Sequence, residues 1–111
     1  MKMETEYVPG TLRVCLLGEL DHHAARSTMS ELEDKLDVLL PSQCVLDLGG
    51  VTFMDSSGIA VVLKSWRRMN ELGGSFRAEN VPEQAMRVLT AAGLDRMIDF
   101  SASACTGGKE L

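Results

Sequence analysis

The sequence predicts an α/β domain built on a mixed β-sheet of four to five strands. Its 111 residues suit one domain of ordinary size, and 45% of them are hydrophobic against 24% that are charged, a balance typical of globular chains. Apolar strand-like runs alternate with stretches of helical period, a pattern that favours helices packed on a parallel sheet. The first two runs lie only a tight turn apart, which predicts an antiparallel pair and therefore a mixed sheet.

The first two strands are expected at residues 6–8 and 11–17, joined by the turn dipeptide Pro9-Gly10. In the second run, apolar residues at every other position alternate with more polar ones, as in a strand with one buried face. Gly18 is expected to end that strand.

A helix is expected next, since apolar residues recur at steps of three and four in Ala25, Met29, Leu32, Leu36 and Leu39. Asp21 suits its start as an N-cap or first-turn carboxylate, and Pro41 is expected to end it. Residues 43–48 then form a compact apolar strand, followed by Gly49-Gly50 and a loop over residues 51–54.

The second helix is expected to begin at Asp55-Ser56-Ser57-Gly58, with an apolar stripe formed by Ile59, Val62, Leu63, Trp66 and Met69. Gly73-Gly74 supplies the stop that commonly follows a helix C-terminus. A short strand is expected at residues 75–79, a third helix from Pro82 to Ala92, and a last strand at residues 97–100.

The charge balance sets aside several classes of function. The chain has 11 Lys and Arg against 16 Asp and Glu, a net charge of −5, which does not suit a protein that gathers basic residues against nucleic-acid phosphates.

No apolar run approaches the ~20 residues of a membrane span. The charged start Met1–Glu4 lacks the apolar core of a signal peptide, and the three cysteines lie too far apart for a redox or zinc motif. The expected location is the cytoplasm.

The segment Asp55-Ser56-Ser57-Gly58 is the most informative for function, because it places two hydroxyls at the start of a helix. Helix N-termini leave backbone N–H groups without partners and carry positive potential, so a phosphate on a serine there would be well received. The simpler interpretation is that Asp55 or Ser56 caps the helix, which is worth about 1 kcal/mol. Gly58 is expected to leave the surface open to a partner or a kinase.

Two segments resemble a known family. Phe53-Met54-Asp55-Ser56-Ser57-Gly58-Ile59 is similar to the signature of STAS-domain anti-sigma-factor antagonists, of the sporulation or general-stress type. Gly18-Glu19-Leu20-Asp21-His22-His23-Ala24-Ala25 resembles the segment that opens the first helix of the sporulation-type members. The resemblance covers about residues 5–100 of a single STAS-like domain over 1–111, with 101–111 expected to be a flexible tail. It implies a sheet with helices packed largely on one side.

The resemblance also implies a regulatory role rather than an enzymatic one, with no cofactor. Members bind an anti-sigma factor that is itself an ATP-dependent serine kinase, and they thereby release the sigma factor. The kinase modifies the residue before the motif glycine, which here is Ser57, and a serine phosphatase reverses the modification. Ser56 is then expected to cap the helix or to bond locally. A monomer or weak dimer is expected, with no direct nucleic-acid or membrane contact.

Six residues are expected to support the switch site and to form the partner surface: Asp21, Met54, Asp55, Ser56, Gly58 and Ile59. Asp21 and Asp55 become acidic neighbours of a Ser57 phosphate if the two segments meet at one edge of the sheet. Met54 and Ile59 flank the switch and are expected to be partly exposed, where they would offer apolar contact to a partner.

Three other kinds of site fit the sequence less well. A serine hydrolase usually carries Gly-x-Ser-x-Gly, whereas no glycine stands two positions before either serine. A response-regulator-like receiver fits poorly, because Asp47 lies inside a strand. A metal site at His22-His23 is disfavoured, since adjacent side chains point apart and no ligand follows at a suitable spacing. The alternative that stays open is a STAS interaction module of another signalling or transport assembly, which carries the serine without using it.

Overall fold

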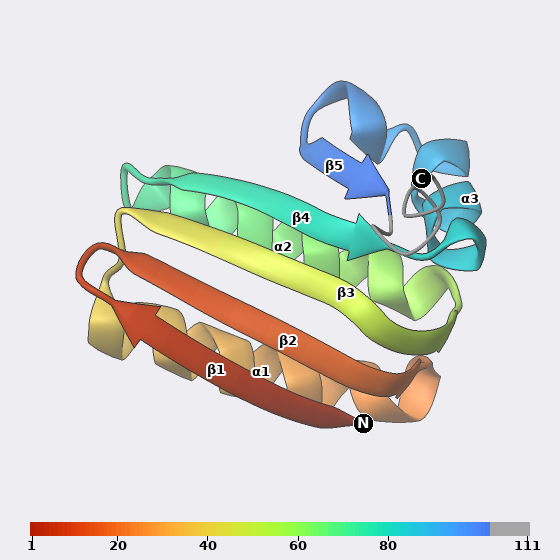
Figure 1. The fold of residues 1–111 in the computed structure, drawn as a ribbon, viewed down its shortest axis with the longest axis horizontal. Coiled ribbons are helices and arrows are strands. Elements are labelled where there is room, and N and C mark those ends of the chain that lie inside the picture. The colour runs from red at the N-terminus through yellow and green to blue at the C-terminus, as the bar shows by residue number, and fades with distance from the viewer. Residues whose placement is uncertain (103–111) are drawn as a thin grey trace, which may run out of the picture.

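The strands form one five-stranded sheet in the order of the sequence, as seen in the computed structural model, which describes residues 1–102 (Figure 1). The first two strands run antiparallel and every later pair of neighbours is parallel, so the sheet is mixed, as predicted. The elements are β1 (Lys2–Val8), β2 (Thr11–Leu20), α1 (His22–Leu39), β3 (Gln43–Met54), α2 (Ser56–Glu71), β4 (Ser75–Val81), α3 (Glu83–Ala91), the 3₁₀ turn η1 (Leu94–Arg96) and β5 (Asp99–Ala102).

The helices lie largely on one side of the sheet because of the handedness of the connections. A crossover between parallel neighbouring strands is almost always right-handed. The crossovers through α1, α2 and α3 all step in the same direction across the sheet, so each delivers its helix to the same face. Figure 1 shows α1 and α2 behind the sheet, with α3 near the end of β4. The predicted fold class is therefore confirmed. No helix within residues 1–102 is both long and apolar enough to cross a membrane.

Alternation along the strands builds the core. In β2, Leu12, Val14 and Leu16 are fully buried, while the residues between them face the other side of the sheet. The helices complete the core with Met29, Leu32 and Leu36 from α1 and Val61, Val62, Ser65 and Met69 from α2. Ile59 and Trp66, which the sequence predicts in the apolar stripe of α2, lie at the margin of that buried face.

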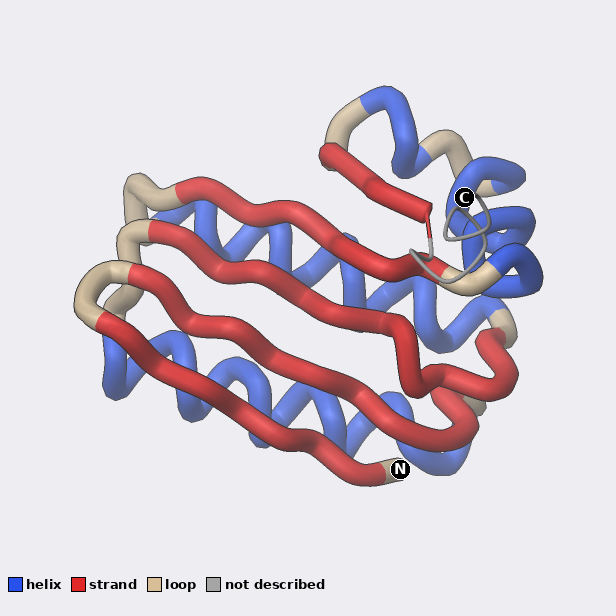
Figure 2. The backbone as a smooth tube through the Cα atoms, viewed as in Figure 1, coloured by secondary structure: helices blue, strands red, loops and turns tan. Residues whose placement is uncertain are grey.

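Strands β2 and β3 continue past their predicted ends, to Leu20 and Met54. They do so because they pair with each other up to that point, with register shifts that absorb extra residues. Gly18 does not end β2 but lies within it at a φ of 110°, a conformation that favours glycine. Figure 2 shows both strands bending at this end of the sheet. The loop predicted over residues 51–54 is thus part of β3.

The last strand begins two residues later than predicted, because the N–H groups of Met97 and Ile98 donate to the Leu94 carbonyl in the turn that follows η1. Residues 101 and 102 belong to β5 rather than to a tail, and the rest of the predicted tail, residues 103–111, lies outside the described residues. At the other end, β1 already begins at Lys2.

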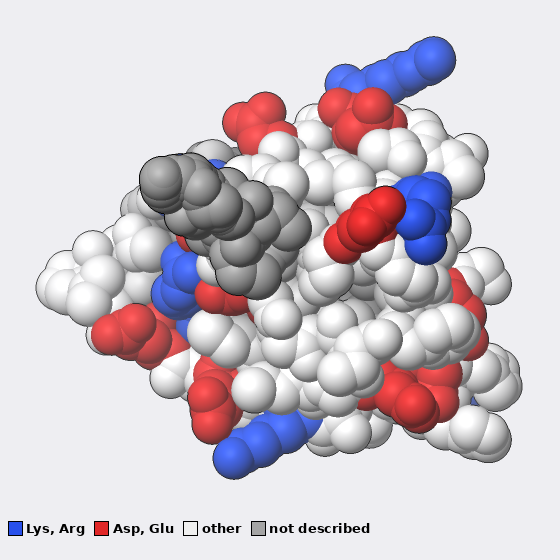
Figure 3. Space-filling view, turned by 45° about the vertical axis from the view of Figure 1, so that its right-hand side comes forward, with Lys and Arg blue, Asp and Glu red and all other residues white. Residues whose placement is uncertain are grey.

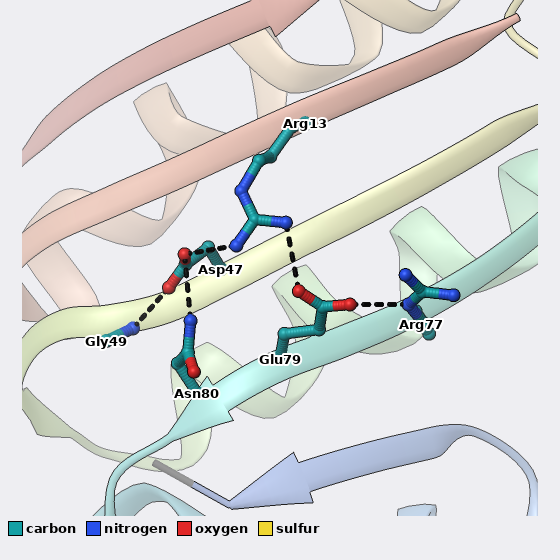
Figure 4. A network of polar contacts seen from close by, with 6 residues as sticks. All are labelled: Arg13, Asp47, Gly49, Arg77, Glu79 and Asn80. Carbon is teal, nitrogen blue, oxygen red and sulfur yellow. Dashed lines mark hydrogen bonds and ion pairs between the residues drawn. The ribbon is translucent and has the colours of Figure 1, made fainter. Parts of the chain in front are cut away.

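A network of polar contacts crosses the face of the sheet opposite α1 and α2 (Figure 4). Arg13 reaches from β2 to Asp47 of β3 at 2.6 Å and to Glu79 of β4 at 2.9 Å. Arg77 and Asn80 add a second partner to Glu79 and Asp47, respectively. The hydrogen bond from Arg13 lowers the pKa of the Glu79 carboxyl. Burial raises the pKa of Asp47, but hydrogen bonds from the Gly49 N–H and from Arg13 outweigh it and lower that pKa below its ordinary value.

Replacing Arg13 with methionine is expected to lower the free energy of unfolding by about 1 kcal/mol at neutral pH, because two half-buried carboxylates lose their counter-charge. The stabilisation by the Arg13 contacts is fully present at a pH above the ordinary pKa values, 3.8 for Asp47 and 4.5 for Glu79. It is lost as the pH falls through the lower pKa values that the two carboxyls have in the folded state. Urea unfolding measured from neutral to acidic pH should therefore show that the free energy of unfolding falls less steeply with decreasing pH in Arg13→Met than in the wild type.

Arg68→Met is the matched control for this prediction. Arg68 also bonds two carboxylates, those of Asp37 and Glu71, but both are largely exposed to solvent. A change at Arg68 should therefore have a smaller effect on both stability and its pH dependence. Equal pH profiles for wild type and Arg13→Met would contradict the contribution assigned to the network.

Candidate functional site

The two segments singled out in the sequence meet at one edge of the sheet. Strands β2 and β3 are parallel neighbours that end together, with Leu20 opposite Met54. The helices that follow them therefore begin side by side. Asp21 is the N-cap of α1, and its Oδ1 accepts a hydrogen bond from the Ala24 N–H at 3.0 Å. The first segment thus supplies the start of α1 next to the start of α2.

Asp55 joins the two helix starts. Its Oδ1 accepts from the Ser57 N–H at 2.8 Å and its Oδ2 accepts from the His22 N–H, in the first turn of α1, at 3.2 Å. The Gly58 N–H donates to the backbone oxygen of Asp55 at 3.0 Å. These three donors are already bonded, so they are not free to receive a phosphate as the sequence interpretation expected. Asp55 is also the cap of α2, and the expectation that Ser56 caps it is wrong: Ser56 is the exposed first residue of the helix.

Gly58 is buried and does not open the surface, contrary to expectation. A Cβ built on it would lie 2.5 Å from Met54 Cγ and 3.3 Å from a Leu20 methyl carbon. The glycine therefore lets the first turn of α2 pack onto the ends of both strands. Met54 is only 1% exposed and Ile59 is half-buried against the core, so the expected partly exposed surface at Met54 is wrong. The exposed apolar residue here is Phe53, which the sequence interpretation missed and which is 43% exposed.

Gln84 of α3 holds the backbone of Met54, just before Asp55, and the sequence does not single it out. Its Oε1 accepts from the Met54 N–H and its Nε2 donates to the Met54 carbonyl, both at 2.8 Å. Strand β3 pairs with β4 only up to Asp47 opposite Glu79, so the amide of Gln84 takes the place of a neighbouring strand beyond that point. No local pattern marks Gln84, because its role arises from where α3 lies in the fold.

Replacing Gln84 with alanine is expected to speed hydrogen exchange at the Met54 amide roughly tenfold, because this N–H loses its protein acceptor. Gln84→Glu keeps the acceptor oxygen and lacks the donor, so it should protect the amide to an intermediate degree. Exchange followed residue by residue by NMR provides the measurement. A Met54 amide that exchanges at the wild-type rate in Gln84→Ala would contradict the role assigned to this side chain.

Ser57 lines a groove between α1 and α2, called the α1–α2 groove below. The groove has a volume of about 690 Å³. Its walls include the apolar residues Ala25, Met29, Ala60 and Val61 and the basic residues His22, His23, Arg26 and Lys64. Ser57 itself is half-buried. The Ser57 hydroxyl forms no hydrogen bond to any of residues 1–102, so within these residues its oxygen is free to bond another molecule.

Residues 1–102 contain no group of three His, Cys, Asp or Glu side chains that could hold a metal ion. The rings of His22 and His23 stand edge to face with their centroids 5.8 Å apart. On the face of the molecule in Figure 3, acidic and basic side chains are scattered over a mostly uncharged surface and adjoin one another in places. Basic side chains of two helices therefore share with Ser57 only the lining of the α1–α2 groove.

Comparison with known proteins identifies relatives of similar length. The family model of the STAS domain matches residues 2–104. The chain is 32% identical over 98 residues to the anti-sigma F factor antagonist of Paenibacillus polymyxa, an alignment that covers 88% of this chain and 84% of that protein. It is 30% identical over 95 residues to the anti-sigma-B factor antagonist of Bacillus subtilis (strain 168), with 82% of each covered.

Among solved structures, the fold is similar to that of the anti-sigma factor antagonist SpoIIAA. The unphosphorylated form of SpoIIAA matches with a TM-score of 0.77 at 24% identity, covering 95% of this chain and 92% of that one. The phosphorylated form from Bacillus matches with a TM-score of 0.70 at 23% identity, covering 95% and 96%. At this level of identity the likeness establishes the shared fold.

Proposed function

This chain belongs to the STAS domain family, and on that premise we propose that it is an anti-sigma-factor antagonist: a regulatory binding protein rather than an enzyme. The names of its relatives at 30–32% identity support this role. In the proposed cycle the chain binds an anti-sigma factor and so frees a sigma factor for transcription. The anti-sigma factor acts as an ATP-dependent serine kinase on Ser57, and a serine phosphatase restores the binding form.

The observation that carries the proposal is the setting of Ser57. The residue lies in the first turn of α2, where Asp55 holds its backbone N–H while its hydroxyl stays unbonded within residues 1–102. A kinase can therefore take this hydroxyl without breaking a hydrogen bond of the fold. The existence of SpoIIAA in unphosphorylated and phosphorylated forms supports a modification in a protein of this fold.

A phosphate on Ser57 would act mainly on the partner surface. It adds about −1.5 to −2 charge at neutral pH and three acceptor oxygens. Asp55 lies next to it and already carries negative charge, while the exposed Ser56 and Phe53 lie within four residues of it. A partner that covers this edge of the sheet must then bury the added charge, which is costly unless the partner offers a matching cation.

The proposal is tested by incubating the protein with candidate anti-sigma factors, ATP and Mg²⁺. Homologues of the partners of anti-sigma F and anti-sigma-B factor antagonists are the first candidates, since the two relatives carry those names. Intact mass should show one added phosphate, and site mapping should locate it at Ser57. Ser57→Ala should abolish the modification, whereas Ser56→Ala should leave it unchanged.

Two results would separate the proposal from the alternative within the family. Stable binding to a partner without any phosphate transfer would favour a STAS interaction module that does not switch. Phosphorylation that persists in Ser57→Ala and disappears in Ser56→Ala would move the switch to the other serine.

A further inference from the structure

We propose that the α1–α2 groove is a phosphate-binding site that captures the phosphate of phosphorylated Ser57, with Arg26 and Lys64 as its two ligands. The inference rests on the proposed function only in taking Ser57 as the modified residue. Beyond that function, the phosphorylated chain binds its own phosphate between α1 and α2.

The charge of the groove supports this site. Two cations, Arg26 and Lys64, line the groove together with the imidazoles of His22 and His23, against the single carboxylate of Glu33. This local balance is opposite in sign to the net charge of −5 of the whole chain. Among residues 1–102, five cations take part in no ion pair: Arg26, Lys35, Lys64, Arg67 and Arg96. Of these, Arg26 and Lys64 line the groove together with Ser57. The groove thus keeps two cations without a partner beside a serine that can gain an anion.

The spacing along α2 brings Lys64 toward Ser57. Residues 57, 60, 61 and 64 all line the groove and follow the three- and four-residue steps of one helix face. Seven residues rise about 10 Å along the axis. Helical side chains lean toward the N-terminus, so Lys64 leans toward Ser57 while the Ser57 side chain leans the same way, and the lysine must extend to meet the phosphate. An extended lysine and a phosphate that extends from Ser57 can together span that length.

Arg26 lies on the α1 side of the same groove. It stands one helical turn after His22, whose N–H is bonded to Asp55 beside Ser57. A guanidinium presents paired N–H donors that match phosphate oxygens, while lysine adds a compact charge. The small side chains of Ala25 and Ala60, which also line the groove, leave room between the helices.

Three N–H groups at the helix starts are not open to the phosphate. The N–H groups of His22, Ser57 and Gly58 are already bonded to Asp55. The carboxylate of Asp55 also repels a second anion at that end. The phosphate is therefore favoured to turn away from Asp55 and into the groove, where it would bridge α1 and α2.

The test introduces phosphoserine at position 57 during translation, so that no kinase is needed. The phosphate is titrated by ³¹P NMR in the full-length protein. Its second pKa is expected to fall by about one unit relative to a phosphoserine peptide of the same sequence, because nearby cations favour the dianion. The combined variant Arg26→Gln/Lys64→Gln should return it toward the peptide value. The two glutamine substitutions should also lower the melting temperature. The drop should be larger in the chain that carries the Ser57 phosphate than in the unmodified chain.

Two matched controls sharpen this test. Phosphoserine at position 56 shares the helix start but lies outside the groove, so its pKa should not respond to the two glutamine substitutions. Arg67→Gln removes an exposed cation of α2 that does not line the groove, and it should leave the Ser57 phosphate unchanged. Titration curves for phosphorylated Ser57 that coincide with and without Arg26 and Lys64 would overturn the inference. A failure of kinases to modify Ser57 would instead count against the proposed function alone.

Discussion

Replacing Ser57 with glutamate is expected to weaken binding to the anti-sigma factor by about 2–5 kcal/mol, at least roughly 30-fold in Kd. The substitution puts a permanent charge where Ser57 has a neutral hydroxyl, next to the carboxylate of Asp55. A partner that closes over this edge must desolvate the new charge, which is costly unless the partner supplies a matching cation. Isothermal titration calorimetry with the purified partner measures the effect directly.

Two further variants separate the effect of losing the Ser57 hydroxyl from the effect of adding a charge. Ser57→Ala removes the hydroxyl without adding charge, so it should bind within a few-fold of the wild type and resist phosphorylation. Ser56→Glu adds the same charge one residue earlier, on the exposed side of the first turn of α2. Wild-type affinity in Ser57→Glu, combined with a strong loss in Ser56→Glu, would show that the partner surface is centred on the other serine.

Replacing Asp55 with alanine is expected to lower the free energy of unfolding by about 2–3 kcal/mol. The loss has two sources. The α2 helix loses its N-cap, worth up to about 2 kcal/mol, and α1 loses the acceptor for the His22 N–H, worth about 1 kcal/mol. Both hydrogen bonds come from the two oxygens of one carboxylate. Urea unfolding followed by circular dichroism gives the free energy.

Two variants separate the cap from the bridge between helices. Asp55→Asn retains an oxygen that can cap α2 but presents an amide N–H₂ toward the His22 N–H, so it should lose only the bridge. Asp21→Ala removes a cap of the same kind from α1, which bonds Ala24 within its own helix, and should cost about 1 kcal/mol. If Asp55→Ala is no more destabilising than Asp21→Ala, the bridge between the helices contributes nothing to stability.

The order of the elements could be predicted from the sequence because short-range patterns control it. The alternation of Leu12, Val14 and Leu16 marks the buried face of β2, and the stripe of α1 lies in the core as expected. The hairpin turn at Pro9-Gly10 and the capping role of Asp21 also depend on neighbours only a few residues away. Each of these features is decided within one turn or one strand.

The ends of β2 and β3 were predicted too early for a different reason. Glycines at positions 18, 49 and 50 normally interrupt a strand, and the local sequence offers nothing against that interpretation. In the fold, each strand supplies the other with hydrogen-bonding partners up to Leu20 and Met54, which outweighs the low strand propensity of glycine. The burial of Met54 and Gly58 follows from this extension, because it carries β3 underneath the first turn of α2.

Local sequence was enough to indicate a small α/β domain with a serine pair at the start of its second helix, since backbone propensity and apolar period act over a few residues. The surroundings of Ser57 depend instead on contacts between distant parts of the chain. Asp55 bonds a residue 33 positions away and Gln84 bonds one 30 positions away, while Arg26 of α1 and Lys64 of α2 line the same groove as Ser57. Such contacts form only when parallel strands end together and align their helices, because hydrogen bonds and charges act over ångströms of space rather than along the sequence.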